Sequence, residues 1–273
     1  MKKKTIAIVL VILLMCCITT TATTTAIVLF IRSREADTTI NRQQEQLNNS
    51  NNTDNNSSSN DETQSPDSNT AIDYTIESNT ILEETEAYSI DIEYPELANY
   101  SDTLTEGTFN DLVFYKVNSL AREIRFSEPS MMSVPNSITL SYTIEYQHER
   151  FISILITGDV YTGGAHPNPV VLTINYDLQE NTELALNDLF VSGSDYLTPI
   201  SNTCIYELQT LLEEDFIEAG ASADADNFTH FNFNETTLKI TFDAYQVGAY
   251  ALGTPSVEMP LVDFSAMLKP EFK

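Results

Sequence analysis

The amino-acid sequence predicts an α+β fold in which antiparallel sheets are each covered by an amphipathic helix. Several short segments alternate apolar and polar residues with a period of two, which is typical of strands with one buried face. Two longer segments repeat apolar residues every three or four positions, as amphipathic helices do. Short strands linked by turns favour antiparallel pairing, and a helix with one apolar face can cover one side of such a sheet.

Residues 1–34 are predicted to form a cytoplasmic stub and a transmembrane anchor. The segment from Ile6 to Ile31 is apolar apart from a threonine-rich middle, and about 20 helical residues suffice to cross a bilayer. Three lysines precede this segment and two arginines follow it, a bias that favours an internal N-terminus. The expected location is therefore the cell membrane, single-pass, with the C-terminal domain extracellular.

Two other interpretations of this segment were weighed. The charged start, the apolar stretch and the small residues around positions 20–22 also suit a cleaved signal peptide. The retained anchor is favoured because the apolar stretch continues beyond that point. A lipoprotein signal is disfavoured because Leu14 and Met15 precede Cys16 and Cys17, where lipidation sites usually carry small residues.

Residues 35–71 are predicted to be a disordered polar linker. They are rich in Asn, Ser, Thr, Gln and Asp, with almost no large apolar residue after Leu47. Such a segment cannot bury enough apolar surface to offset the entropy of ordering. We therefore expect it to act as a stalk that lets the folded region stand away from the membrane.

The first folded half is predicted to span residues 72–167. Its helix is expected near residues 106–124, where Phe109, Val113, Val117 and Ile124 share one face. A hairpin turn is expected around residues 148–150. The expected strands are residues 72–77, 88–94, 138–146 and 151–156.

The second half is predicted to span residues 168–273. A helix is expected from about 195 to 215, with Ser194 or Asp195 as its N-cap. Cys204 lies on the apolar stripe of this helix and is the only cysteine outside the N-terminal apolar segment, so we expect a buried thiol and no intrachain disulfide in the folded region. The expected strands are residues 170–176, 238–242 and 257–261.

Four short motifs carry the most information about the family. Two glycines precede Ala-His-Pro in the motif Tyr161-Thr162-Gly163-Gly164-Ala165-His166-Pro167, which predicts a shaped turn between two strands. The others are Asn175-Tyr176-Asp177-Leu178, Leu186-Asn187-Asp188-Leu189-Phe190 and the aromatic segment from Phe242 to Gly253. Together they resemble the family called domain of unknown function 3298, the C-terminal half of the extracellular region of RsiV-like anti-sigma factors. Family 4163 (PdaC/RsiV-like) commonly precedes it, so the resemblance covers residues 72 to about 270.

The resemblance implies an extracellular binding domain. Only five residues precede Ile6, where a full anti-sigma factor carries a sigma-binding segment, so the resemblance does not extend to transcriptional control. Beyond position 34 the chain carries eight basic and 40 acidic residues, a net charge of −32 that repels nucleic acid and anionic lipid. Some relatives bind lysozyme, which is strongly basic, so the expected partner is lysozyme, another basic protein or a cell-wall glycan.

A search for catalytic motifs found none. His148, His166 and His230 are far apart, and neither a zinc pattern nor a phosphate-binding or nucleotide-binding glycine loop is present. Asp224 and Asp226 lack the spacing of a calcium loop. Family 4163 also occurs beside polysaccharide deacetylase modules, but such a module needs its own Asp and His metal ligands. We therefore expect no enzyme activity, no metal and no cofactor.

The candidate ligand-binding residues flank the two glycine-containing motifs. Tyrosine combines apolar area with a hydroxyl and is enriched in binding hot spots. His166 has two interpretations: a structural one, in which backbone groups satisfy its ring, and a functional one, in which it contacts a ligand or carries a proton. The sequence favours the structural one. The candidates are Tyr161, Gly163, Gly164, His166, Tyr176, Tyr245 and Tyr250.

The leading hypothesis from the sequence is a membrane-anchored, extracellular, non-enzymatic binding module of the RsiV-like type. One alternative is a cell-wall polysaccharide hydrolase or deacetylase that uses His166. Another is a structural envelope protein with no soluble ligand. A substrate screen with His166→Ala distinguishes the first alternative from simple binding.

Overall fold

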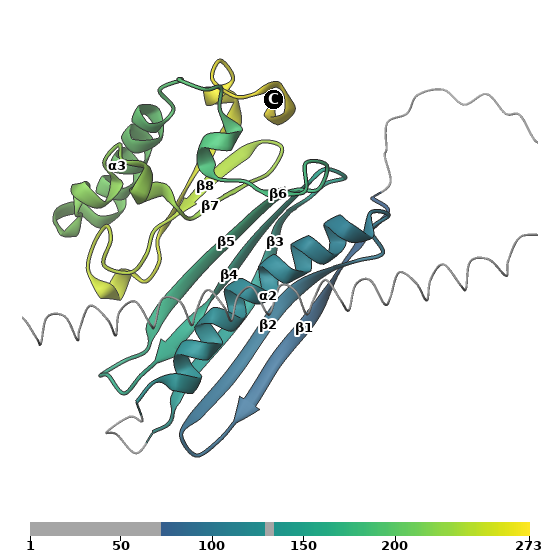
Figure 1. The fold of residues 1–273 in the computed structure, drawn as a ribbon. Helices are drawn as coiled ribbons and strands as arrows, with labels where there is room; N and C mark the ends of the chain where they lie inside the picture. Colours follow the sequence, from purple (N-terminus) through teal and green to yellow (C-terminus); the bar gives the residue numbers. More distant parts are fainter. Residues whose placement is uncertain (1–71, 129–133) are drawn as a thin grey trace, which may run out of the picture. The chain divides into compact units, whose positions relative to one another are not determined.

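The computed structural model describes residues 72–128 and 134–273, which lie in one compact unit (Figure 1). Two sheets and a small number of helices confirm the α+β class. The predicted membrane segment from Ile6 to Ile31 and the predicted linker at 35–71 lie outside the described residues. Within the described part of the chain, no helix is both long enough and apolar enough to cross a membrane.

The larger sheet has six strands whose spatial order follows the sequence. All neighbouring strands are antiparallel except β2 and β3, which are parallel. The prediction of purely antiparallel sheets is therefore wrong for this pair, because α2 connects the two strands and returns the chain to the same end of the sheet. The strands are β1 (Thr75–Glu84), β2 (Tyr88–Ala98), β3 (Asn136–Gln147), β4 (Phe151–Tyr161), β5 (Asn168–Asp177) and β6 (Thr182–Glu183).

Helix α2 (Thr103–Phe126) covers one face of this sheet and contains the helix predicted at 106–124. It begins after Asp102, whose side chain accepts a hydrogen bond from the backbone N–H of Leu104. Its buried side chains recur every three or four residues and pack on strands β2 to β5. The buried helical residues are Thr105, Phe109, Val113, Val117, Ala121 and Ile124.

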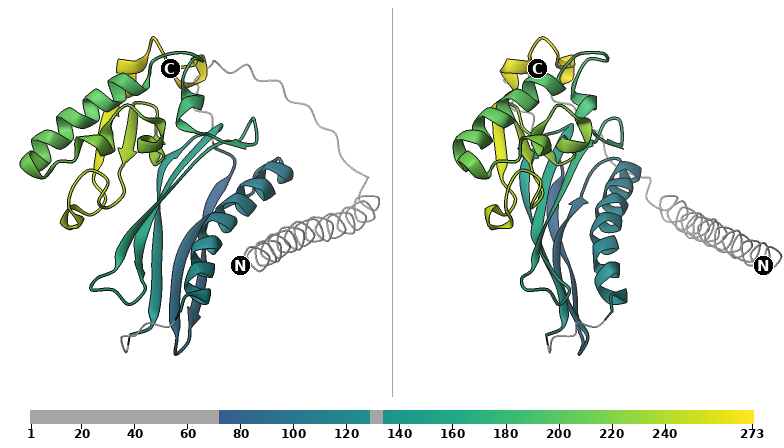
Figure 2. Two further views of the ribbon diagram at one scale, coloured as in Figure 1. Left: turned by 60° about the vertical axis from the view of Figure 1, so that its left-hand side comes forward. Right: turned by 90° about the vertical axis from the view of Figure 1, so that its left-hand side faces the viewer.

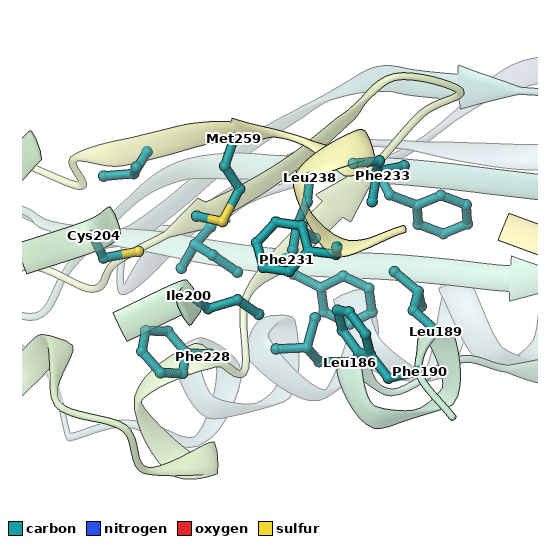
Figure 3. Close-up of a cluster of buried hydrophobic side chains, with 14 of the residues drawn as sticks. Leu186, Leu189, Phe190, Ile200, Cys204, Phe228, Phe231, Phe233, Leu238 and Met259 are labelled. Carbon is teal, nitrogen blue, oxygen red and sulfur yellow. The ribbon is translucent and has the colours of Figure 1, made fainter. Parts of the chain in front are cut away.

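The smaller sheet contains β7 (Phe231–Phe233), β8 (Thr237–Thr241) and β9 (Ser256–Pro260), all antiparallel. Helix α3 (Leu197–Leu212) packs against it through Ile200, Cys204 and Leu208 (Figure 3). Cys204 is fully buried and unpaired, as predicted. Short 3-10 helices connect these elements: η1 (Leu186–Leu189), η2 (Glu213–Asp215), η3 (Glu218–Ala221), η4 (Ala225–Phe228), η5 (Tyr250–Leu252), η6 (Leu261–Phe264) and η7 (Pro270–Phe272).

The start of α3 is capped by Asp195, one of the two residues predicted. Its carboxylate accepts a hydrogen bond from the Thr198 backbone N–H at 3.3 Å. Tyr196 directly precedes the helix, with a helical backbone and no capping hydrogen bond from its side chain. Pro199 lies in the first turn of α3 and has no backbone N–H. The number of N–H groups that need a hydrogen-bond partner at this end of the helix is therefore lower by one.

The smaller sheet packs on the face of the larger sheet opposite α2 (Figure 2). Ile152 and Ile154 of β4 point towards α2, whereas Phe151 and Ser153 point towards β7. The same alternation holds in β5, because successive residues of a strand project to opposite faces. Both faces of these two strands are therefore buried where the two sheets overlap.

Three buried polar side chains connect the sheets. The Ser153 hydroxyl donates to the Asn175 side-chain oxygen at 2.7 Å and accepts from the Asn232 amide at 2.9 Å. The Asn175 amide in turn donates to the Phe231 carbonyl oxygen at 2.7 Å. Buried polar groups need such partners, so this network fixes how β7 sits on β4 and β5.

The boundary expected between residues 167 and 168 lies in the turn between β4 and β5. These strands pair along their whole length, from Phe151 with Asp177 to Val160 with Asn168. A division of the chain at this turn would separate two strands of one sheet.

Candidate functional site

The turn between β4 and β5 presents His166 at the protein surface. Gly163 has a φ of 88°, a conformation that favours glycine. The His166 Nδ1 atom lies 3.1 Å from the Pro167 carbonyl oxygen. A carbonyl only accepts, so this hydrogen bond requires the proton on Nδ1, and the neutral ring then has an unprotonated Nε2 atom.

The segment after β8 carries two tyrosines, one of which packs on this turn. The Tyr250 ring stacks on the imidazole of His166, with ring centroids 3.8 Å apart and an angle of 26° between the planes. The Tyr250 hydroxyl also donates to the Pro167 carbonyl oxygen. Tyr245 lies with its ring centroid 5.5 Å from that of Tyr250, and its side chain is largely exposed. We call His166, Tyr245 and Tyr250 the aromatic cluster.

The segment that carries Tyr245 and Tyr250 is held in place by Gln246. Its amide donates to the carbonyl oxygens of Gly220 and Asn227, both at 2.9 Å, and its side-chain oxygen accepts from the Asp243 backbone N–H. Gly248 follows, and a Cβ atom there would lie 2.3 Å from the end of the Leu252 side chain, which would have to move.

A contact between a histidine and an aspartate lies next to the same segment. The His230 Nε2 atom is 3.4 Å from an Asp243 carboxylate oxygen. The hydrogen bond from His230 lowers the pKa of Asp243, although partial burial acts in the opposite direction. The carboxylate therefore stays charged to a lower pH than an isolated aspartate would.

The structure brings together five of the seven predicted ligand-binding residues. Gly163, Gly164 and His166 belong to the turn, Tyr250 stacks on it, and Tyr245 lies next to Tyr250. Tyr161 ends β4 and is half-buried.

Tyr176 does not belong to this surface. Its side chain is 1% exposed, packs edge-on against Phe109 of α2, and donates its hydroxyl proton to the Asn181 side chain. The inclusion of Tyr176 among surface ligand-binding residues is therefore wrong. Its position in β5 points it into the core beneath α2.

The remaining motif residues stabilise the fold. The buried Asp177 carboxylate accepts hydrogen bonds from the Arg150 guanidinium and from the backbone N–H groups of Gln179 and Glu180. Asp188 accepts from the Ala185 backbone N–H at the start of η1. Both motifs around these residues thus close turns of the chain.

No metal site was found in the described ranges. They contain no group of three or more His, Cys, Asp or Glu side chains placed to hold a metal ion. Asp224, which was considered as a calcium ligand, instead accepts a hydrogen bond from the Asp226 backbone N–H at the start of η4.

Comparisons with known proteins divide the chain into two segments. Residues 81–169 match the family described as deacetylase PdaC, and residues 187–261 match the family described as protein of unknown function DUF3298. The chain has the PdaC–DUF3298 architecture. His166 therefore lies in the PdaC segment, within the half expected at residues 72–167. Tyr245 and Tyr250 lie in the DUF3298 segment, so the aromatic cluster joins the two.

A curated relative and two solved structures support this architecture. The chain is 23% identical over 201 residues to the peptidoglycan-N-acetylmuramic acid deacetylase PdaC of Bacillus subtilis (strain 168), a match covering 72% of this chain and 42% of the relative. A DUF3298 protein from Pseudomonas aeruginosa PAO1 is 16% identical with a TM-score of 0.53. One from Bacteroides fragilis NCTC 9343 is 14% identical with a TM-score of 0.55. The matches cover 74% and 73% of this chain and 96% of each neighbour, and they show a shared fold.

These findings correct the functional hypothesis from the sequence. A non-enzymatic module that recognises lysozyme or a wall glycan was expected, together with no enzyme activity. The PdaC family match and the deacetylase relative contradict both expectations and favour the stated alternative, a cell-wall deacetylase.

Proposed function

We propose that this chain acts in the deacetylation of N-acetylated cell-wall glycan, with the aromatic cluster contacting the sugar. The observation that carries the proposal is the PdaC match over residues 81–169, which includes the His166 turn. The name of the curated relative supplies the substrate class. The cluster is one of the places where side chains from the PdaC segment and the DUF3298 segment meet.

The cluster offers two kinds of contact to a sugar. The apolar C–H face of a sugar ring packs on an aromatic ring, and the exposed Tyr245 ring provides such a surface. The Nε2 atom of neutral His166 is available as a proton acceptor, because Nδ1 is engaged with the Pro167 carbonyl oxygen.

These groups suit hydrolysis of an acetamido group by general base catalysis. His166 Nε2 takes a proton from a water molecule as its oxygen bonds to the acetyl carbonyl carbon. The carbon–nitrogen bond then breaks, and the proton passes from His166 to the leaving nitrogen. The products are acetate and the free amino sugar, so one water molecule is consumed for each acetyl group removed.

The test is acetate release from N-acetylated peptidoglycan strands by the full chain, kept in mild detergent because of its apolar N-terminal segment. We expect release by the wild type, and a decrease of about 100-fold or more in His166→Gln, in line with the usual contribution of a general base. His148→Gln is the matched control, since His148 lies at the turn between β3 and β4, away from the cluster.

Two outcomes would contradict the proposal. If the wild type releases no acetate from a preparation that an established deacetylase does process, the chain does not have this function. If His166→Gln is folded and as active as the wild type, His166 is not the proton acceptor.

The proposed function requires the described residues to be outside the cell, where the wall glycan is. This agrees with the anchor expected from Ile6 to Ile31 and with the net charge of −32 beyond position 34, which disfavours nucleic acid as a partner. Protease treatment of intact cells tests the location: the folded region should be released into the medium, whereas full protection would place it inside.

A further inference from the structure

A cavity of about 650 Å³ lies beside the free edge of β5, and its lining includes Asn175, Leu186 and Asn187 of two sequence motifs. Its lining includes Lys116 of α2, Leu172 and Thr173 of β5, Leu184 after β6, and Phe231 of β7. Known small-molecule sites have volumes of roughly 300 to 1,000 Å³. The cavity is therefore large enough for one or two sugar units.

The edge of β5 provides unpaired backbone groups to this cavity. Strand β6 pairs only with Tyr176 and Asp177, so within the described residues no strand covers the edge at Thr173. The Asn175 carbonyl oxygen points outward from this edge, since it accepts from the Leu184 backbone N–H at 2.7 Å. The N–H and C=O groups of Thr173, two residues earlier, project from the same edge.

Two contacts between polar side chains lie at the cavity. Lys116 Nζ lies 2.8 Å from a Glu183 carboxylate oxygen, and His230 Nε2 lies 3.4 Å from an Asp243 carboxylate oxygen. Both contacts offer donors and acceptors to hydroxyl groups, and the charges of Lys116 and Glu183 compensate each other. The ring of Tyr196 and the side chains of Leu184 and Phe228 supply apolar walls.

We infer that this cavity binds an uncharged N-acetylated sugar unit, whose acetamido group pairs with the Thr173 backbone at the edge of β5. An acetamido group has one N–H donor and one C=O acceptor, as an added strand residue does. Its methyl group then packs against the apolar walls. The cavity and its preference for an uncharged amide follow from the structure, whereas the choice of a sugar rests on the proposed function.

The first test measures binding of N-acetylglucosamine oligomers to the full chain by calorimetry, with glucose oligomers of equal length for comparison. We expect saturable binding of the N-acetylated oligomer alone. Ala185 lines the cavity and is exposed, so Ala185→Trp should fill the space and weaken binding by at least about tenfold, equivalent to 1.4 kcal/mol. Ala87→Trp, at an exposed position in the turn between β1 and β2, should bind like the wild type.

The second test concerns the backbone pairing. Thr173→Pro removes the outward N–H at the cavity, and Val171→Pro removes the next outward N–H of the same edge, outside the cavity lining. Pro169 is, like Val171 and Thr173, a residue of β5 whose backbone groups face the free edge. The edge therefore accommodates proline. Thr173→Pro should weaken binding more than Val171→Pro, with the folding of each variant checked by circular dichroism.

The outcomes separate this inference from the proposed function. Binding of the oligomer that Ala185→Trp does not change, or binding of a wall stem peptide in its place, would overturn the cavity assignment even if acetate is released. Binding that Ala185→Trp abolishes, without acetate release by the wild type, would leave the cavity assigned and overturn the deacetylation proposal. Absence of any binding by the wild type would overturn the cavity assignment.

Discussion

The imidazole of His166 and the phenol ring of Tyr250 are stacked with centroids 3.8 Å apart, although one lies in the PdaC segment and the other in the DUF3298 segment. The Tyr250 hydroxyl donates to the carbonyl oxygen of Pro167, the residue after His166. The turn that carries His166 is therefore oriented by a tyrosine from the other segment.

Substitution of Tyr250 should separate its two contributions to stability. Tyr250→Phe keeps the stacked ring and removes the hydrogen bond, so it should lower the free energy of unfolding by about 0.5–1.5 kcal/mol. Tyr250→Ala also removes the ring pair and should cost about 0.5–1.5 kcal/mol more. Urea denaturation measures both. Tyr206→Ala, an exposed position on α3, is the control, and equal stability of all variants would show that the stack is not stabilising.

The buried network between the sheets should be sensitive to loss of one hydroxyl. Ser153→Ala leaves the Asn175 side-chain oxygen without its donor and the Asn232 amide without its acceptor. Unsatisfied buried polar groups cost about 1–3 kcal/mol each, so this variant should lose at least about 1 kcal/mol in urea denaturation. Ser141→Ala, exposed on β3, should differ from the wild type by less than about 0.5 kcal/mol. A similar small effect for Ser153→Ala would mean that the network relaxes without loss.

The hydrogen bond between Asp243 and His230 should make stability depend on acid pH. The pKa of Asp243 is lower in the folded protein than in the unfolded chain. Its contribution is therefore fully present above about pH 4, the ordinary aspartate value. It is lost as the pH falls through the lower folded pKa. The stability difference between the wild type and Asp243→Asn should therefore shrink from pH 7 towards pH 2.5, and a difference that is constant with pH would contradict this.

The thiol of Cys204 should be unreactive in the folded protein. Burial raises its pKa to about 12, so the reactive thiolate is scarce at neutral pH. In a Cys16→Ser, Cys17→Ser background, iodoacetamide should label Cys204 slowly in buffer and rapidly in urea, as followed by mass spectrometry. Equal labelling rates would show that α3 opens readily.

The parts of the fold that the sequence predicted are those with strong local periodicity. Phe109, Val113 and Val117 define α2 because a helix repeats every 3.6 residues. The alternation in β3 and β4 predicted strands for the same physical reason, with ends that differ by a few residues. Strand β7 was missed because three residues are too few to show a period.

The parts that could not be predicted depend on contacts distant in the sequence. The parallel pairing of β2 with β3 depends on the path of α2, and no local pattern records it. The motifs identified both halves of the aromatic cluster, but not that His166 and Tyr250 touch. Tyr176 was misassigned because alternation does not show which face of a strand is exposed, and both faces of β5 are covered at this point.

The alternating faces of β5 also restrict how the strand can align. Ile174 and Tyr176 pack beneath α2, whereas Asn175 between them bonds to Phe231 of β7. A shift of β5 by one residue would exchange these partners and place the amide under the helix. A β4–β5 hairpin closed one residue out of register would therefore lose both its packing on α2 and its hydrogen bond to the smaller sheet.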